Sequence, residues 1–520
     1  MDKRVTAKQA IALIKDGDTV AISGFQLATA ATGLYAALAK SFRETGHPRD
    51  LTLMQAAGNM GVVTMSEEGL WRRYITGHFA SNQKMIDMAN NNKIEVYNFP
   101  QGVICHMYRA AAAGKAGEVS RIGLGTFCDP RQGGGKLNDR TKEDLVKLVD
   151  IDGEEYLLYK TPRLDIALVR GTTSDEYGNI TIEEESSSID MLDVVMGVKG
   201  RGGKVIVQVK NYVSSASIDR SRVLVPGCMV DAIYVAEKPE SEHLQTPGAF
   251  YDPAIAGHYR LGNLFFATLP MNERKVIARR AAMELSENSV VNLGIGIPEC
   301  VANVASEEGV GDKLILTLES GLIGGIPAGG VHFGSSYNAW AGIPMASIFD
   351  YYNGGNLSFT SLGFAEVDAS GNINVSKFGE KIAGAGGFID ISSSTPVIAF
   401  TGTMTTGGFK CEIKDGKMVI LKEGRRKKFL KSIEQITFNA KENLDSGKKI
   451  LFITERCVFQ LTKDGLLLTE VAPGISVDKD ILPMMEFQPQ ISANLKLMDK
   501  RIFREEPMGL AQMINPIREC

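Results

Sequence analysis

The sequence lacks the signals of a membrane, secreted or metal-binding protein. It has no stretch of about 18 uninterrupted apolar residues and no apolar segment at its N-terminus, so we expect neither a membrane span nor a secretory signal. Its seven cysteines are scattered and never form a CxxC pair, which argues against a disulfide framework or a thiolate metal site. We therefore expect a soluble, cytoplasmic protein that binds no metal, and we interpret the cysteines as small core residues.

Several catalytic motifs are also absent. There is no GxSxG elbow, no GxxxxGK[ST] phosphate loop and no HExxH metal motif. The segment 133–137 (GGGKL) fails as a phosphate loop because Leu137 follows the lysine. Serine hydrolases and ordinary NTPases are therefore disfavoured.

The composition is that of an ordinary globular protein. The chain has 520 residues, of which 44% are hydrophobic and 23% charged. At roughly 100–200 residues per domain, it has room for two or three cores. Lys and Arg number 57 against 61 Asp and Glu, and a net charge of −4 gives no reason to expect a nucleic acid or an anionic membrane as partner.

Two distant parts of the chain share one pattern, which indicates an internal duplication. In 10–25 and again in 281–296, a helical apolar pattern leads to a short strand and a glycine turn, with Gly24 and Gly296 at an offset of 272. Further on, 175–180 matches 368–373 at an offset of 193. The difference of 79 predicts an extra segment in the first half, and the charged stretch 132–159 makes up a good part of it.

Short apolar runs predict the strands of a parallel sheet. The runs 51–54, 166–169 and 314–318 alternate with helical patterns, which is typical of an α/β fold. We predict two similar Rossmann-like domains with mostly parallel sheets, at 1–237 and 271–520, joined by a linker at 238–270. The polar, proline-containing start of that linker suits an exposed segment.

Glycine is abundant where the predicted strands end. There are 55 glycines, about 11% of the chain against a usual ~7%. Most of them are expected in tight turns between strand and helix. Because ligands bind at the carboxyl ends of strands in such sheets, the glycine clusters also indicate where a site can lie.

One carboxylate stands out among these turns. The apolar run 314–318 is followed directly by Glu319, Ser320 and Gly321, and then by a Gly-Gly pair. A charge directly after a buried strand is costly unless it is used or paired. A purely structural role, in which Glu319 caps the next turn through backbone amides, is the more common one for a lone glutamate in this position.

Glu319-Ser320-Gly321 with the following Gly-Gly resembles the nucleophile motif of the family I coenzyme A transferases. Segments from essentially the whole chain are similar to the acetate and propionate CoA-transferase branch, namely 100–102, 109–110, 127–132, 134–138, 371–378, 384–390, 453–456 and 471–474. That branch is a fusion of two subunit types, in agreement with the duplication. The segment 23–30 departs from the glycine turn that many relatives have at this place. This difference bears on which acid is bound, not on the chemistry.

The resemblance implies a short-chain acyl-CoA:carboxylate CoA-transferase, with Glu319 carrying a glutamyl-CoA thioester in a ping-pong reaction. Acyl-CoA and short-chain carboxylates would be its partners, acetate, propionate, butyrate and lactate among them. No cofactor beyond the substrate coenzyme A is implied. The family forms homotetramers or dimers, and we expect one of these states.

The resemblance also assigns roles around the nucleophile. Gln101 would donate to the acid, and the amides of Gly386 and Gly387 would serve the external acyl carbonyl. The segment Gly294-Ile295-Gly296 would serve the glutamyl carbonyl and, with Gly384, bind coenzyme A. Each glycine is equally well explained as a plain turn residue.

Other candidate residues stay outside the predicted site. His78 and His106 are lone histidines, which are more often structural than catalytic. The basic run 425–428 is predicted to be a solvated face.

Three other functions stay open on the sequence. An acyl-CoA hydrolase would use the same Glu319 with water as acceptor. A sugar-phosphate isomerase fits the fold class but would need a phosphate site, for which no loop is present. A non-enzymatic acyl-CoA sensor would have no use for an intact Glu319.

Overall fold

The computed structural model describes residues 2–262, 264, 266–444 and 447–514, which divide into two compact units. The first unit comprises Met1–Gly262, Leu318–Asp350 and Phe378–Asp390, and the second comprises Asn263–Thr317, Tyr351–Lys377 and Ile391–Cys520. Two segments of the C-terminal half of the chain thus group with the N-terminal half. The two domains predicted from the sequence, 1–237 and 271–520, stay a prediction about the duplicated halves of the chain.

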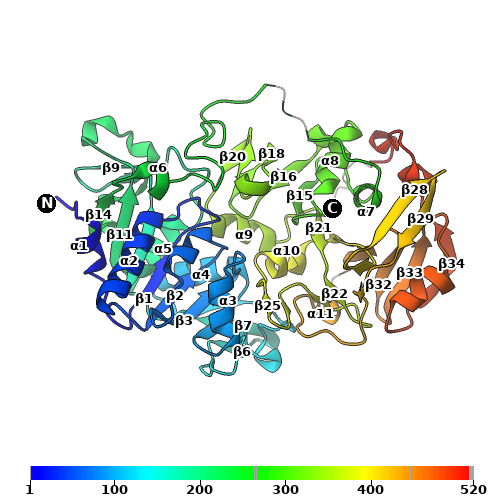
Figure 1. The fold of residues 1–520 in the computed structure, drawn as a ribbon, viewed down its shortest axis with the longest axis horizontal. Helices are drawn as coiled ribbons and strands as arrows, with labels where there is room; N and C mark the ends of the chain where they lie inside the picture. The colour runs from blue at the N-terminus through cyan, green and yellow to red at the C-terminus, as the bar shows by residue number, and fades with distance from the viewer. Residues whose placement is uncertain (1, 263, 265, 445–446, 515–520) are drawn as a thin grey trace. The chain divides into compact units, whose positions relative to one another are not determined.

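A seven-stranded parallel sheet forms the centre of the first unit (Figure 1), in the order β14-β11-β8-β1-β2-β3-β4. Its strands are β1 (Thr19–Ile22), β2 (Leu51–Gln55), β3 (Trp71–Thr76), β4 (Glu95–Asn98), β8 (Ile166–Arg170), β11 (Lys204–Val209) and β14 (Ala232–Val235). Its helices are α1 (Ala7–Ile11), α2 (Thr32–Thr45), α3 (Gln83–Asn90), α4 (Gln101–Ala112), α5 (Met191–Gly200) and α6 (Pro239–Glu242). The residues of β1, β2 and β8 are all buried, as expected for strands with helices on both faces.

Within its described residues up to 262, this unit has two smaller sheets. One has the order β5-β7-β6, with β5 (Gly117–Ser120), β6 (Val146–Ile151) and β7 (Glu154–Lys160) all antiparallel. The other has the order β12-β9-β10-β13, with β9 (Thr173–Asp175), β10 (Ile180–Thr181), β12 (Asn211–Val213) and β13 (Val223–Val225). All but the last residue of the β6-β7 hairpin lies in the charged stretch 132–159, which the sequence predicted as part of the extra segment.

The second unit has its own parallel strands, in the order β16-β15-β21-β26-β31, followed by β32, β33 and β34. They are β15 (Val290–Leu293), β16 (Ile315–Thr317), β21 (Phe359–Gly363), β26 (Val397–Thr401), β31 (Lys449–Ile453), β32 (Cys457–Thr462), β33 (Gly465–Val471) and β34 (Gln490–Leu497). Its helices include α7 (Glu273–Ala282), α8 (Cys300–Glu307) and α11 (Ala440–Leu444), and a hairpin joins β28 (Lys410–Lys414) to β29 (Lys417–Lys422). Apolar residues of α7 and α8 pack with Val291 of β15 in its core.

The topology of the two units supports the duplication. In the first unit β1 lies between β2 and β8, and β8 pairs with β11. In the second unit β15 lies between β16 and β21, and β21 pairs with β26. All of these pairs are parallel. The strands matched by the sequence offsets therefore take the same places in both sheets.

The matched Gly-Asn turns also have the same hydrogen bonds. Asp175 Oδ1 accepts the N–H groups two and four residues further on, at 3.0 and 2.8 Å, and Asp368 Oδ1 does the same at 2.9 and 2.9 Å. The side-chain amide of Asn179 donates to Asp175 at 2.8 Å, and that of Asn372 donates to Asp368 at 2.9 Å. Such side-chain turns depend on a short local segment, so a sequence repeat of six residues reproduces them.

The predicted exposed linker is partly buried. His243, Gln245 and Thr246 are all buried in the first unit. The side-chain amide of Gln245 donates to the carbonyl of Glu184 at 2.7 Å, and the hydroxyl of Thr246 contacts His332 Nδ1 at 2.8 Å. The expectation of exposure is wrong for these three residues, and the polar groups of Gln245 and Thr246 can be buried because partners within the fold satisfy them.

In the run 425–428 the first three residues are exposed, while the Lys428 ammonium lies 4.9 Å from the ring centre of Phe364. No helix in the described part of the chain is long and apolar enough to cross a membrane. Four of the six described cysteines are buried, namely Cys105, Cys128, Cys300 and Cys457.

Candidate active site

Glu319 lies at the tip of a tight turn in the first unit. The N–H of Leu318 donates to the carbonyl of Leu322, and the N–H of Gly321 donates to the carbonyl of Leu318, both at 2.9 Å. The turn leads into β17 (Leu322–Ile323), which pairs with β20 (Ala341–Gly342). Glu319 is half-buried and lies in a turn that backbone hydrogen bonds close.

Only glycine fits at position 321. Its φ is +93°, and a Cβ there would lie 1.8 Å from the carbonyl oxygen of Ile343. The Ile343 N–H in turn donates to the carbonyl of Gly321 at 2.9 Å. The Gly321 of the sequence motif therefore has a definite structural reason, because a side chain would displace the turn that carries Glu319.

A neighbouring loop holds the other side of this turn. The hydroxyl of Ser187 donates to the carbonyl of Ser320 at 2.5 Å. Ser320 itself is buried, and its hydroxyl has no hydrogen-bond partner within the described residues. The backbone that follows Glu319 is thus held by Ser187 and Ile343, two residues from other segments of the chain.

The loop that contains Ser187 also contacts the first-half glycine turn. Glu185 forms a buried ion pair with Arg170 (2.8 and 2.7 Å) and accepts the N–H of Thr29 at 3.0 Å. Burial alone would raise the pKa of Glu185, but the charge of Arg170 and hydrogen bonds from His243 and Arg170 lower it to about 2.

Asp190 lies at the end of the same loop and contacts Ser23. Its Oδ1 accepts the hydroxyl of Ser23 at 2.7 Å, and burial raises its pKa to about 7. The segment 23–30 is thereby tied to the loop that supports Glu319.

Gln101 begins α4 and is buried. Its backbone N–H donates to the carbonyl of Gly386 at 2.9 Å, and its side-chain Nε2 donates to Met345 Sδ at 3.3 Å. The Met345 N–H donates to the carbonyl of Ile189 at 2.8 Å, in the loop that supports Glu319. A thioether is a weak acceptor, so a carboxylate can take the place of Met345 at the Gln101 amide.

The glycine loop at 384–387 packs on the loop after β3. Gly384 has φ +89°, and a Cβ there would lie 2.7 Å from the carbonyl oxygen of Gly77. The N–H of Gly386 donates to that same carbonyl at 2.8 Å, and the N–H of Ala385 donates to Asn98 Oδ1 at 2.9 Å. Because the Gly386 N–H is engaged, the N–H of Gly387 is the stronger candidate of the two predicted donors.

The segment Gly294-Ile295-Gly296 follows β15 in the second unit. The N–H of Gly294 donates to Ser361 at 2.9 Å and so belongs to the sheet. Ile295 is 66% exposed, and Gly296 has φ +88° with open space where a Cβ would be. The N–H groups of Ile295 and Gly296 have no acceptor in the part of the chain that the structure describes, so they are available to a ligand.

The predicted site residues thus fall into two groups. Glu319, Gln101 and the 384–387 loop belong to the first unit, and Gly294-Ile295-Gly296 belongs to the second. Ser187 contacts the turn of Glu319, Met345 contacts Gln101 and Ile189, and Asp190 lies in the same loop as Ser187 and Ile189. No sequence motif marks these three residues. The catalytic roles of the predicted site residues stay predictions.

His106 has a structural environment. Its Nε2 lies 2.9 Å from Asp350 Oδ1, and Arg109 contacts both Asp350 and Asp193. Burial lowers the pKa of His106, but the bond to Asp350 and its charge outweigh this effect and raise the pKa. This pairing agrees with leaving His106 outside the catalytic set.

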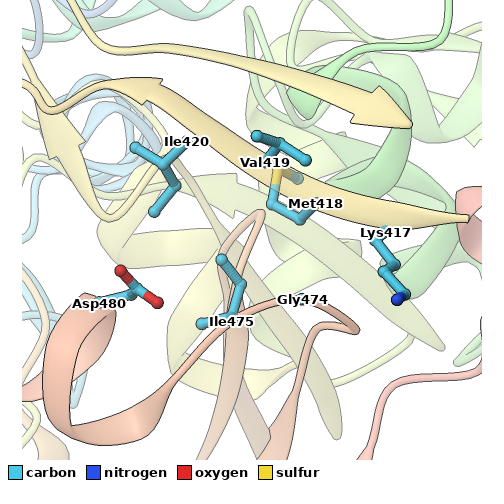
Figure 2. Close-up of a pocket in the computed structure, with 7 residues that line it drawn as sticks. All are labelled: Lys417, Met418, Val419, Ile420, Gly474, Ile475 and Asp480. Atoms are coloured by element: carbon cyan, nitrogen blue, oxygen red, sulfur yellow. The ribbon is translucent and has the colours of Figure 1, made fainter. Parts of the chain in front are cut away.

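The second unit contains a separate cavity of about 280 Å³. Figure 2 shows Lys417 and Asp480 at its two ends, with Ile475 between them. The Asp480 carboxylate accepts the N–H of Ser476 at 2.8 Å. None of the predicted site residues lines this cavity, and we assign it no catalytic role.

Comparison with known proteins identifies the family to which this chain belongs. Residues 4–236 match the family model described as coenzyme A transferase. Caffeate CoA-transferase of Acetobacterium woodii is 45% identical over 522 residues, covering 98% of this chain and 99% of that protein. Acetate CoA-transferase YdiF of Escherichia coli O157:H7 is 44% identical over 511 residues, covering 97% and 96%. The chain belongs to the coenzyme A transferase family and is a CoA-transferase enzyme.

A solved structure gives the same result for the fold. The acyl-CoA transferase YdiF from E. coli O157:H7, in a thioester complex with CoA, matches with a TM-score of 0.91 and 43% identity, covering 99% of this chain and 98% of that one. Its apoenzyme matches with a TM-score of 0.93. The predicted α/β CoA-transferase fold is confirmed.

Proposed function

We propose that this protein is a short-chain acyl-CoA:carboxylate CoA-transferase that works by a ping-pong reaction through a glutamyl-CoA thioester on Glu319. The observation that carries the proposal is the position of Glu319 on a closed turn in which only glycine fits at 321. The thioester complex that the 43% identical YdiF forms with CoA also supports the proposal. A fixed carboxylate suits covalent catalysis, which divides one difficult exchange into easier steps.

The proposed chemistry needs only carboxylates and thioesters. The Glu319 carboxylate attacks the carbonyl of acyl-CoA, the C–S bond breaks, and the CoA thiolate departs. The acyl group is then joined to Glu319 as a mixed anhydride. The thiolate then attacks the glutamyl carbonyl, the anhydride C–O bond breaks, and the first acid departs from glutamyl-CoA. A second acid reverses these steps. Because one thioester replaces another, the exchange requires no cofactor beyond coenzyme A.

Each addition passes through a tetrahedral oxyanion, which fixed N–H donors stabilise. We assign the N–H of Gly387 to the external acyl group and the N–H groups of Ile295 and Gly296 to the glutamyl carbonyl. Gly294-Ile295-Gly296 and Gly384 would also bind coenzyme A. Loss of one such donor typically lowers the rate ~10²–10³-fold.

The preferred acids are part of the proposal. We propose that acetate and propionate are among the acids exchanged; one relative is named for caffeate and another for acetate. An assay of thioester loss with and without added acetate separates transfer from hydrolysis. The predicted homotetrameric or dimeric state and the cytoplasmic location belong to the same proposal.

Covalent trapping tests the assignment of Glu319. The protein is incubated with acetyl-CoA and then with borohydride, which we expect to reduce and label Glu319 and to inactivate the enzyme. Glu319→Gln keeps the shape of the side chain and should show neither label nor transfer. Glu319→Asp shortens the side chain and should cost ~10²-fold in rate. Active protein without a modification at Glu319 would overturn the proposal.

A further inference from the structure

A cavity of about 540 Å³ lies in the first unit, beside the glycine loop at 384–387. Its walls come from the segment after β3, from α3 and from the segment of β25 (Lys381–Ile382). Two of its apolar lining residues, Ile86 and Ile382, are 4% and 2% exposed, whereas Ser81 and Lys381 are exposed. It therefore combines apolar, buried walls with a polar entrance, as small-molecule sites commonly do.

His78 lines this cavity, and its tautomer is fixed by the backbone. The N–H of Ala80 donates to His78 Nδ1 at 3.0 Å, which leaves the ring proton on Nε2. Burial also lowers the pKa of His78 to about 4, so the ring is neutral at neutral pH. Within the described residues no acceptor lies in hydrogen-bond distance of Nε2. His78 is thus a fixed, neutral donor at the wall of a cavity.

The same ring lies beside the residues assigned to the exchanged acid. A Cβ built on Gly386 would lie 3.8 Å from His78 Cδ2 and 3.9 Å from Gln101 Oε1. Because Nε2 is bonded to Cδ2, the donor edge of the ring and the Gln101 amide both lie close to Gly386. The N–H of Phe79 donates to the carbonyl of Ala383 at 2.9 Å, so the loop of His78 and the cavity wall form one hydrogen-bonded structure.

We propose that His78 Nε2–H donates a hydrogen bond to the carboxylate of the exchanged acid and that the adjoining cavity holds the side chain of that acid. This inference rests on the proposed transferase function and names its acid subsite. A neutral donor orients a carboxylate without reducing its nucleophilicity as far as a paired cation would. The cavity is much larger than acetate, so the subsite also accepts longer alkyl and aryl acids.

Substitutions of His78 test the donor. His78→Leu should lower kcat/KM for the acceptor acid about 10- to 100-fold, mainly through KM, because it removes a hydrogen bond to a charged group. His78→Gln offers an amide donor near the same position and should recover most of this loss. The matched control is His47→Gln, since the side chain of His47 is 60% exposed. Acceptor kinetics of His78→Leu within twofold of wild type would refute the role of His78.

Two further readouts keep this inference separate from the proposed function. Trapping of CoA on Glu319 should still occur in His78→Leu, and its absence in the wild type would refute the transferase mechanism rather than the role of His78. If His78→Leu does not fold, NMR of wild-type protein with ¹⁵N-labelled histidine decides instead. Saturating acetate should shift the Nε2 resonance of His78, assigned by its loss in His78→Gln, and an unchanged resonance would exclude contact with the acid.

A series of acids tests the cavity. With acetate, butyrate, hexanoate and cinnamate as acceptors, each buried methylene should raise kcat/KM about fourfold until the cavity is filled. Ala383→Phe narrows the cavity and should lower the ratio of kcat/KM for hexanoate over acetate at least tenfold. An unchanged ratio would show that the side chain of the acid binds elsewhere.

Discussion

Gly321→Ala should disable the enzyme without touching a reacting atom. The new Cβ would lie 1.8 Å from the carbonyl oxygen of Ile343, whereas real Cβ atoms essentially never approach closer than 3.0 Å. Either the turn or the backbone at Ile343 must therefore shift by about 1.2 Å, the difference between these two distances. A misplacement of roughly 1 Å can cost about 10²-fold in rate, so we expect a loss of that order in kcat/KM.

The matched control is Gly342→Ala in the strand paired with β17. A Cβ at Gly342 would meet only Leu322 Cδ2, at 3.6 Å, which is an ordinary contact. Steady-state kinetics and trapping of CoA on Glu319 should both be impaired in Gly321→Ala and nearly unchanged in Gly342→Ala. Equal activity of the two variants, with both folded, would show that the geometry of this turn does not control the reaction.

Three further substitutions test the surroundings of the site. Gln101→Ala should lower kcat/KM for acetate by one to two decades, since a hydrogen bond to a charged acid contributes ~1.5–3 kcal/mol. Glutamyl-CoA should still form from acyl-CoA in this variant. Unchanged acceptor kinetics with lower thermal stability would show that Gln101 is only a turn residue. Arg170→Met should lower the free energy of unfolding by ~3–5 kcal/mol at pH 7, because it leaves Glu185 buried without its partner, whereas the exposed Arg163→Met should change it little. The difference for Arg170→Met should narrow as the pH falls from about 4.5 towards 2, since Glu185 has a folded pKa of about 2 against an ordinary 4.5; a constant difference in denaturant titrations would contradict this. Asp190 has a folded pKa of about 7 against an ordinary 3.8, so its contribution to stability is lost as the pH rises through this range, and Asp190→Asn should gain thermal stability relative to wild type between pH 5 and pH 8.

Much of the fold follows from local sequence. The apolar runs at 51–54 and 166–169 form buried parallel strands, because a continuous apolar run cannot leave either face in water. The turns at Asp175 and Asp368 form the same hydrogen bonds because all their partners lie within four residues of the aspartate. The duplication was therefore visible from residue spacing alone.

The candidate site could be predicted from sequence only in part. Glu319 and Gly321 stand out because a charge and then a glycine occur at the end of an apolar run. The N–H of Gly386 was a predicted donor, but its engagement by Gly77 links residues more than 300 positions apart, and no local pattern reports it.

The sequence by itself determined the buried strands, the duplication and the glutamate that follows a strand, since each depends on residues close together in the chain. Only the tertiary structure decided that 318–350 and 378–390 belong to the first unit, that Met345 faces Gln101, and that His78 lies beside Gly386 at a cavity. Each of these arises from packing between distant segments. Such contacts form when buried backbone groups find partners across the fold, and the residues concerned carry no motif that announces them.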